Sequence, residues 1–363
     1  MKRGFLKAAV VSLVLGTMFV STDINAESYN IRMDEGKVYN NEKLVVDYTG
    51  EIFSQRIENG KVYINDKLVY DADSDNIGST DSSNISRISG EDRYETNLKS
   101  INNNFKKSDY AVVVSGEGYA DALSASPYAK KINAPLFFLN KNSVSDKIIT
   151  TMKSLGVKNI EIIGGNNSIS NIQENIIKSK LGVNINRITG SDRYETSKNI
   201  YSKMGDSTSA IVVSGQDFPD ALSSVSLAAE LNAPIVLNNE ENIRNINSNN
   251  SLENVYIVGG ERSVPSISIE SKKNSERISG VDRYETSMKI YEKVRGNKNI
   301  LVSGKVFPDS LSAVNLMQNN ADKWNLLLTN KDSINKNTKE LVEKNTTIIL
   351  GGTESISKTL FNK

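Results

Sequence analysis

The sequence predicts an α/β protein of three tandem Rossmann-like parallel-sheet domains, preceded by a small β-hairpin module. Two observations support this prediction. A ten-residue motif occurs three times, starting at Arg87, Arg187 and Arg277, and eight of its positions are identical in all copies. Each copy opens a unit of about 90 to 100 residues with the same landmarks in the same order. Within each unit, continuous apolar runs alternate with amphipathic segments, as in a parallel sheet covered by helices on both faces.

The first residues are typical of a signal peptide. A basic start is followed by an apolar run from Ala8 to Val20 and by small residues ending at Ala26. This run is shorter than the about 20 residues that a membrane-spanning helix needs. We therefore expect residues 1–26 to be removed, and the chain to be secreted with no membrane insertion after cleavage.

Residues 27–71 contain a smaller repeat, Gly36–Asp47 and Gly60–Asp71. Each copy has two short β-prone runs around a polar pair, which predicts a β-hairpin. Two hairpins of this size are marginal alone, so the module either is a spacer or pairs with itself, a partner or the later domains. Residues 72–86 are rich in Asp, Ser and Asn, as expected of a linker.

Composition excludes several classes of chemistry. The chain has no cysteine and no histidine, which removes Ser-His-Asp catalysis, cysteine nucleophiles and the usual zinc sites. The paired glycines of each unit match neither a dinucleotide fingerprint nor a Walker loop, so we predict no cofactor and no metal. The 44 basic residues are balanced by 43 acidic ones, which does not favour a nucleic-acid partner.

The three large units cover residues 87–186, 187–276 and 277–363. In each, the motif predicts a short strand and then a helix that begins with a capping box. A second strand ends in Ser-Gly, and an Asp opens the next helix six residues after the Ser. A third, apolar strand and a fourth strand ending in Gly-Gly complete the unit. The three helix-opening aspartates are Asp121, Asp220 and Asp309.

These motifs resemble the cell wall binding repeat 2 family of clostridial cell-wall and S-layer-associated proteins. The resemblance covers residues 87–363 and implies a pseudo-threefold arrangement of the three repeats. It also implies a location at the cell wall or cell surface and binding of an anionic secondary cell-wall polysaccharide. Other surface-layer proteins are further candidate partners, and residues 27–71 would be the variable, displayed part.

The candidate residues fall into three groups. We interpret Asp92, Glu95, Asp192, Glu195, Asp282 and Glu285 as structural capping residues. The candidate polymer-binding residues are Arg93, Arg193, Arg283, Asn140, Asn238, Asn239 and Asn330. The apolar triplets that match the anchoring motif of the family are Leu136, Phe137, Phe138, Ile235, Val236, Leu237, Leu326, Leu327 and Leu328.

Two of these groups have alternative interpretations. The three arginines could bind acidic groups of a polymer or bridge one repeat to the next by pairing with an Asp. The apolar triplets could anchor the protein or be buried core strands, in which case a substitution abolishes binding by unfolding the module.

The sequence favours a non-catalytic wall-anchoring protein. Three linked weak sites raise avidity by roughly 10² to 10⁴ on a repetitive polymer. One alternative is a wall-polymer hydrolase that uses carboxylates, which would need a carboxylate pair peculiar to one repeat. Another is an adhesin or structural surface-layer protein that acts through residues 27–71.

Overall fold

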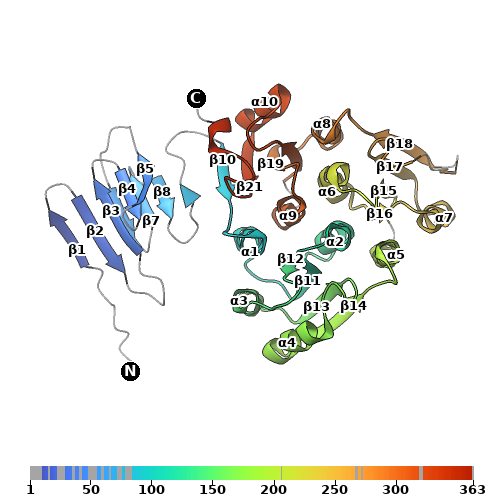
Figure 1. Ribbon diagram of the computed structural model, residues 1–363, viewed down its shortest axis with the longest axis horizontal. Helices are drawn as coiled ribbons and strands as arrows, with labels where there is room; N and C mark the ends of the chain where they lie inside the picture. The colour runs from blue at the N-terminus through green and yellow to red at the C-terminus, as the bar shows by residue number, and fades with distance from the viewer. Residues whose placement is uncertain are drawn as a thin grey trace. The chain divides into compact units, whose positions relative to one another are not determined.

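A computed structural model of the protein describes residues 10–14, 17–22, 29–34, 37–40, 43–47, 55–58, 61–64, 67–71, 76–77, 84–205, 207–265, 269–270, 273–318 and 322–361. The chain divides into two compact units, Met1–Arg87 and Ile88–Lys363, and we describe each by itself. Figure 1 labels their helices and strands.

The first unit consists of antiparallel strands in two sheets. Its strands are β1 Val10–Val14, β2 Thr17–Thr22, β3 Tyr29–Asp34, β4 Lys37–Asn40, β5 Lys43–Asp47, β6 Gln55–Glu58, β7 Lys61–Ile64, β8 Lys67–Asp71 and β9 Asn76–Ile77. One sheet has the order β1-β2-β3-β4-β5 and the other β6-β7-β8-β9. β4 with β5 and β7 with β8 are the two hairpins expected from the small repeat.

The two hairpins share one geometry and one core. In the first, the register shifts between Val38 and Tyr39, and in the second it shifts at the equivalent place, between Val62 and Tyr63. The buried residues of both sheets form a single cluster of Ile31, Val38, Val46, Val62, Ile64, Val69 and Tyr70. The hairpin module therefore pairs with itself.

Strands β1 and β2 lie within the predicted signal peptide and pair with each other, and β2 also pairs with β3. The predicted cleavage site at Ala26 and most of the predicted linker lie outside the described residues. Export and cleavage therefore stay predictions. In the described part of the chain, no helix is long and apolar enough to cross a membrane.

The second unit contains three parallel sheets with helices packed against them, so the predicted fold class is confirmed. The elements of the first repeat are β10 Ile85–Ile88, α1 Arg93–Asn104, β11 Tyr110–Ser115, α2 Tyr119–Lys131, β12 Leu136–Leu139, α3 Asp146–Leu155, β13 Asn159–Ile163 and α4 Asn171–Leu181. The elements of the second repeat are β14 Asn184–Ile188, α5 Arg193–Met204, β15 Ser209–Val213, α6 Pro219–Leu231, β16 Ile235–Leu237, α7 Glu240–Ser248 and β17 Asn254–Val258. The third repeat has β18 Asn274–Ile278, α8 Arg283–Val294, β19 Lys298–Ser303, α9 Phe307–Ser312, the 3₁₀ turn Ala313–Leu316, β20 Trp324–Thr329, α10 Lys336–Lys344, β21 Thr346–Leu350 and the 3₁₀ turn Lys358–Leu360.

The strand that opens each repeat belongs to the sheet of another repeat. The three sheets have the orders β12-β11-β13-β14, β16-β15-β17-β18 and β20-β19-β21-β10. Thus β14 extends the first sheet, and the Gly164 N–H donates to the Ile188 carbonyl over 2.9 Å. The first opening strand, β10, extends the third sheet, where the Gly351 N–H donates to the Ile88 carbonyl over 2.9 Å. The three repeats therefore form a closed ring.

Helices α2, α6 and α9, the second helix of each repeat, contact one another in the middle of the ring (Figure 1). They are rich in buried Ala and Ser, and small side chains allow helices to approach closely. A single core cluster joins equivalent strand residues of the three sheets, such as Val114, Val213 and Val302. The arrangement is pseudo-threefold, with its axis between these helices.

Candidate functional site

The opening motif forms the same helix start in all three repeats. The Asp92 side chain accepts a hydrogen bond from the Glu95 backbone N–H over 2.8 Å. Glu95 Oε2 accepts one from the Glu91 backbone N–H over 2.7 Å. The same contacts recur in Asp192–Glu195 and Asp282–Glu285. The backbone hydrogen bond lowers the pKa of Glu95 and of both its counterparts, so these carboxyl groups are charged caps and poor general acids.

The candidate arginines bind backbone carbonyls at the carboxyl ends of strands. Arg93 Nη1 donates to the Gly116 carbonyl over 2.8 Å, and Arg193 and Arg283 make the equivalent contact in their repeats. Arg93 also lies over the Phe307 ring of the third repeat, with Cζ 5.7 Å from the ring centroid. Arg193 lies over the Tyr119 ring of the first repeat in the same way, so Arg93 and Arg193 bridge repeats through aromatic rings. Arg93 and Arg193 remain exposed.

The candidate asparagines have different roles. Asn140 and Asn330 follow equivalent strands, and each contacts the motif tyrosine of its repeat. The Asn140 side-chain amide donates to the Tyr94 hydroxyl over 3.4 Å, and the Tyr284 hydroxyl donates to Asn330 Oδ1 over 2.5 Å. Asn239 caps α7 by accepting from the Asn242 backbone N–H over 2.8 Å. Asn238 contributes its backbone N–H, which donates to the Val213 carbonyl over 2.8 Å.

The apolar triplets are completely buried edge strands. All nine side chains are at most 1% exposed. Since an edge strand has unpaired backbone groups, side chains of the adjacent helix bind them. In the first repeat, Asn97 donates to the Leu136 carbonyl over 2.9 Å and accepts from the Phe138 N–H over 3.0 Å. Ser197 and Ser287 contact the equivalent strands. A polymer on the surface of this fold therefore cannot contact the triplets.

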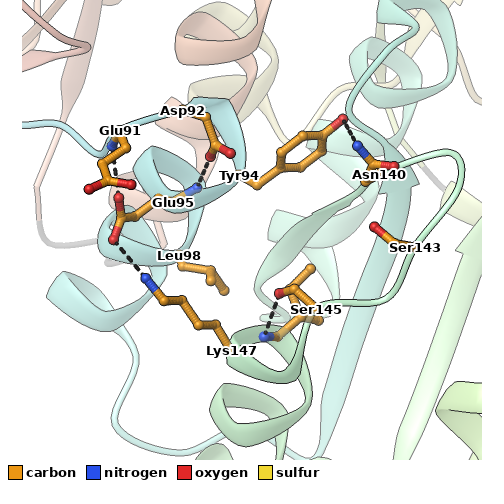
Figure 2. Close-up of a pocket in the computed structure, with 10 residues that line it drawn as sticks. Glu91, Asp92, Tyr94, Glu95, Leu98, Asn140, Ser143, Ser145 and Lys147 are labelled. Carbon is orange, nitrogen blue, oxygen red and sulfur yellow. Dashed lines mark hydrogen bonds and ion pairs between the residues drawn. The ribbon is translucent and has the colours of Figure 1, made fainter. Parts of the chain in front are cut away.

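A cavity of about 250 Å³ lies where the first triplet strand ends (Figure 2). Its lining residues are Glu91, Asp92, Tyr94, Glu95, Leu98, Asn140, Ser143, Ser145, Lys147 and Ile148. Figure 2 shows Lys147 reaching back to Glu95, with which it forms an ion pair of 3.2 Å. Three carboxylates against one lysine make this cavity unfavourable for an acidic ligand.

A second hollow, of about 420 Å³, is lined in part by the loop that follows Asn140. Amide and hydroxyl side chains dominate its lining, which is Lys141, Asn142, Asn166, Asn167, Ser170, Ile172, Gln173 and Ile176. Ile172 is 72% exposed. The side-chain amide of Gln173, one of the lining residues, donates a hydrogen bond to the Asn140 carbonyl and so connects α4 to the loop. Asn140 does not line this hollow, and sequence reasoning missed the hollow because Lys141 and Asn142 meet residues from the loop after the Gly-Gly turn and from α4.

Comparison with known proteins identifies the repeats. Residues 87–174, 187–270 and 277–361 match the family described as Cell wall binding domain 2 (CWB2). The chain belongs to the CWB2 family. The predicted recognition is therefore confirmed for each of the three repeats.

Two curated Bacillus subtilis (strain 168) proteins contain similar sequence. The chain is 31% identical over 288 residues to N-acetylmuramoyl-L-alanine amidase LytC, covering 77% of this chain and 58% of the amidase. It is 33% identical over 298 residues to Amidase enhancer, covering 79% of this chain and 40% of that protein. The chain thus spans roughly half the length of these relatives.

Two solved structures from Clostridium difficile have a similar fold. Cwp8 aligns with a TM-score of 0.67 and 27% identity over 76% of this chain and 50% of Cwp8. Cwp6 aligns with a TM-score of 0.69 and 22% identity over 96% of this chain and 56% of Cwp6. The fold of this chain therefore occurs in solved structures.

Each CWB2 repeat has a sheltered aspartate in the first turn of its second helix, Asp121, Asp220 or Asp309. Burial raises the pKa of Asp121 and of Asp220 above the usual value. Asp121 accepts a hydrogen bond from the Ser168 hydroxyl over 3.2 Å. The fold therefore disfavours the charged form of this carboxyl. The protonated Asp121 therefore stabilises the folded state. This contribution to stability is complete below the unfolded pKa of 3.8 and is lost as the pH rises through the raised folded pKa.

We expect Asp121→Asn to raise the melting temperature at pH 7, because the amide keeps the shape and the acceptor without the buried charge. The gain should shrink as the pH falls towards 4, where the wild-type carboxyl becomes protonated. Thermal unfolding of both proteins between pH 4 and pH 8 measures this difference. A variant less stable than wild type at pH 7, with a deficit that grows with pH, would contradict the assignment.

Proposed function

We propose that the chain holds itself on the Gram-positive cell wall without covalent chemistry, by binding an anionic secondary wall polysaccharide through its CWB2 repeats. It thereby displays the hairpin module at the cell surface. The observation that carries the proposal is the polar hollow beside Lys141 at the carboxyl edge of a CWB2 repeat. Open α/β sheets bind their ligands at this edge.

The lining of the hollow fits a sugar chain with acidic groups. Asn142, Asn166 and Asn167 offer both donors and acceptors to sugar hydroxyls. Lys141 supplies a positive charge for a carboxylate or phosphate. The exposed Ile172 provides an apolar surface for the C–H face of a sugar ring. The neighbouring cavity lined by Glu91, Asp92 and Glu95 repels such acidic groups, so the polymer lies over the second hollow.

The proposal includes no hydrolytic step. Asp92 and Glu95 form the carboxylate pair of the opening motif that recurs in all three repeats, and each member of the three pairs accepts a backbone hydrogen bond. A hydrolase needs one carboxyl group that stays protonated near neutral pH, and the lowered pKa of Glu95 is opposed to that role. The amidase activity in the name of LytC belongs to that protein.

Sedimentation with isolated wall tests the function. The full chain is mixed with Gram-positive wall sacculi, with or without prior removal of the secondary polymer by hydrofluoric acid. We expect co-sedimentation with intact wall and little with stripped wall. Retention should also fall as the salt concentration rises, because charged groups contribute to binding. Equal retention on stripped wall would refute the proposal.

Charge reversal at Lys141 tests the site. Lys141 is exposed, so we expect Lys141→Glu to leave the melting temperature unchanged and to weaken wall retention about threefold to tenfold. Lys107→Glu is the matched control, because it makes the same charge change at an exposed position just before β11, at the opposite end of the sheet. If both variants bind equally, the hollow is not the site.

A further inference from the structure

Three aromatic residues meet on the pseudo-threefold axis. Tyr119, Phe218 and Phe307 stand at the starts of α2, α6 and α9, four residues after the Ser that ends the preceding strand. The ring centroids of Tyr119 and Phe218 are 5.5 Å apart, and those of Phe218 and Phe307 are 5.7 Å apart. The third pair, Tyr119 and Phe307, is separated by 6.2 Å. We call these three residues the axial aromatic cap.

The axial aromatic cap is only partly covered by protein. Each of its three residues has intermediate exposure, and the adjacent Val306 is 42% exposed. A cap that served only to join the repeats would be expected to bury its rings in the core. Partly exposed apolar side chains gathered at one point are typical of a binding surface.

Two arginines lie over rings of the axial aromatic cap. Cζ of Arg93 lies 5.7 Å from the Phe307 ring centroid and that of Arg193 lies 5.6 Å from the Tyr119 centroid. Arg193 also donates to the Tyr119 hydroxyl over 3.1 Å. An arginine has five N–H donors in a planar fork, and the contacts of Arg93 and Arg193 described above use Nη1. Both residues are exposed, so further donors can reach an anion.

The charged residues near the cap come from the loops before it and from the opening motif. The three loops before the cap residues contain Glu117, Asp217 and Lys305, and the motif arginines add Arg93, Arg193 and Arg283. Asp121, Asp220 and Asp309 follow two residues after the cap residues, and burial raises the pKa of Asp121 and of Asp220. The exposed carboxylates of the three loops are therefore those of Glu117 and Asp217. The Glu117 carboxylate accepts a hydrogen bond from the Lys141 backbone N–H over 3.1 Å, which holds this carboxylate against the loop that contains Lys141.

We propose that the axial aromatic cap binds one sugar residue that carries a carboxylate or phosphate. The apolar face of the sugar packs on the rings and its acidic group binds the guanidinium groups of Arg93 and Arg193. This inference rests on the proposed wall-polymer function and adds a different site. Each molecule has one such site, built jointly by all three CWB2 repeats, in addition to the hollow beside Lys141.

Saturation-transfer difference NMR on the full chain tests this site with small probes. Glucuronic acid and glucose 6-phosphate supply the two kinds of acidic group, and glucose is the uncharged comparison. We expect transfer to both acidic sugars in the wild type and weaker transfer to glucose. Phe218→Leu keeps an apolar side chain but removes the central ring, and Arg193→Gln removes one guanidinium. When Lys141→Glu is also present to remove binding at the hollow, both should reduce transfer to the acidic sugars about threefold to tenfold.

Arg244→Gln is the matched control, because Arg244 is an exposed arginine on α7 outside the cap. Its transfer should equal that of the wild type, and circular dichroism checks that all variants are folded. Absence of transfer in the wild type, or full transfer in folded Phe218→Leu that also carries Lys141→Glu, would overturn the inference. The wall-sedimentation result is independent of these outcomes, so failure of the axial site is distinguishable from failure of the proposed function.

Discussion

Phe137→Ala should lower the free energy of unfolding by about 3–5 kcal/mol, because it removes a large side chain that is 0% exposed. The strand it belongs to is an edge strand at full burial, so the surrounding residues have little room to refill the cavity. Urea unfolding measures the loss. Phe137→Leu is the matched control and should cost less than about 1.5 kcal/mol, since it keeps most of the apolar volume.

The same variant separates an anchoring contact from a folding effect. At a low temperature where circular dichroism shows Phe137→Ala to be folded, its wall retention should equal that of the wild type. Above its reduced melting temperature, retention should disappear. If the folded variant already fails to bind the wall, the triplet strand takes part in binding directly and the buried assignment is wrong.

Ile88→Ala should destabilise the ring of repeats by about 2–4 kcal/mol, as expected for a buried isoleucine. Ile88 is 7% exposed and lies in the strand that closes the third sheet. Its counterparts, Ile188 and Ile278, are 4% and 3% exposed in the strands that extend the first and second sheets. Because the ring is closed, we expect Ile188→Ala and Ile278→Ala to cost similar amounts.

Thermal and urea unfolding of the three variants compares these positions. If Ile88→Ala leaves the free energy of unfolding nearly unchanged while Ile188→Ala and Ile278→Ala lower it strongly, the first and third repeats do not close on each other. Similar losses in a single cooperative transition would support closure, because a closed ring couples all three sheets.

The repeated motif made the local structure predictable. Asp92 and Glu95 have the spacing of a capping box, and Asp92 does accept from the Glu95 backbone N–H. The reciprocal bond is displaced by one residue, because Glu95 accepts from the backbone N–H of Glu91 and not from that of Asp92. The invariant glycine two residues before Asp92 also has a physical reason. A Cβ on Gly90 would lie 2.5 Å from the Glu95 Cβ, so only glycine fits against the capped helix start.

The closure of the ring could not be predicted from the motif alone. The residues before Arg187 look like the start of a repeat, yet β14 hydrogen-bonds to β13 of the repeat before it. Strand pairing depends on residues far apart in the sequence, and a local pattern does not reveal the partner. The predicted boundaries at residues 187 and 277 accordingly fall inside β14 and β18.

The contacts of the site also depended on long-range structure. Asn140 and Asn330 were recognisable as residues after strands, but only the fold shows that both reach a motif tyrosine. The aromatic residues Tyr119, Phe218 and Phe307 recur two positions before the predicted aspartates. That recurrence was visible in the sequence, whereas the meeting of the three rings on one axis required the arrangement of the repeats.

The sharing of strands limits how such proteins can evolve. If one repeat were deleted, the remaining two could not close a ring with the same angle between neighbouring repeats. If a fourth repeat were added, the central helices would have to move apart to make room for its helix. The copy number is therefore fixed at three by geometry. Novel domains should accumulate before the first strand of the ring or after the last, where an insertion leaves every interlocked sheet intact.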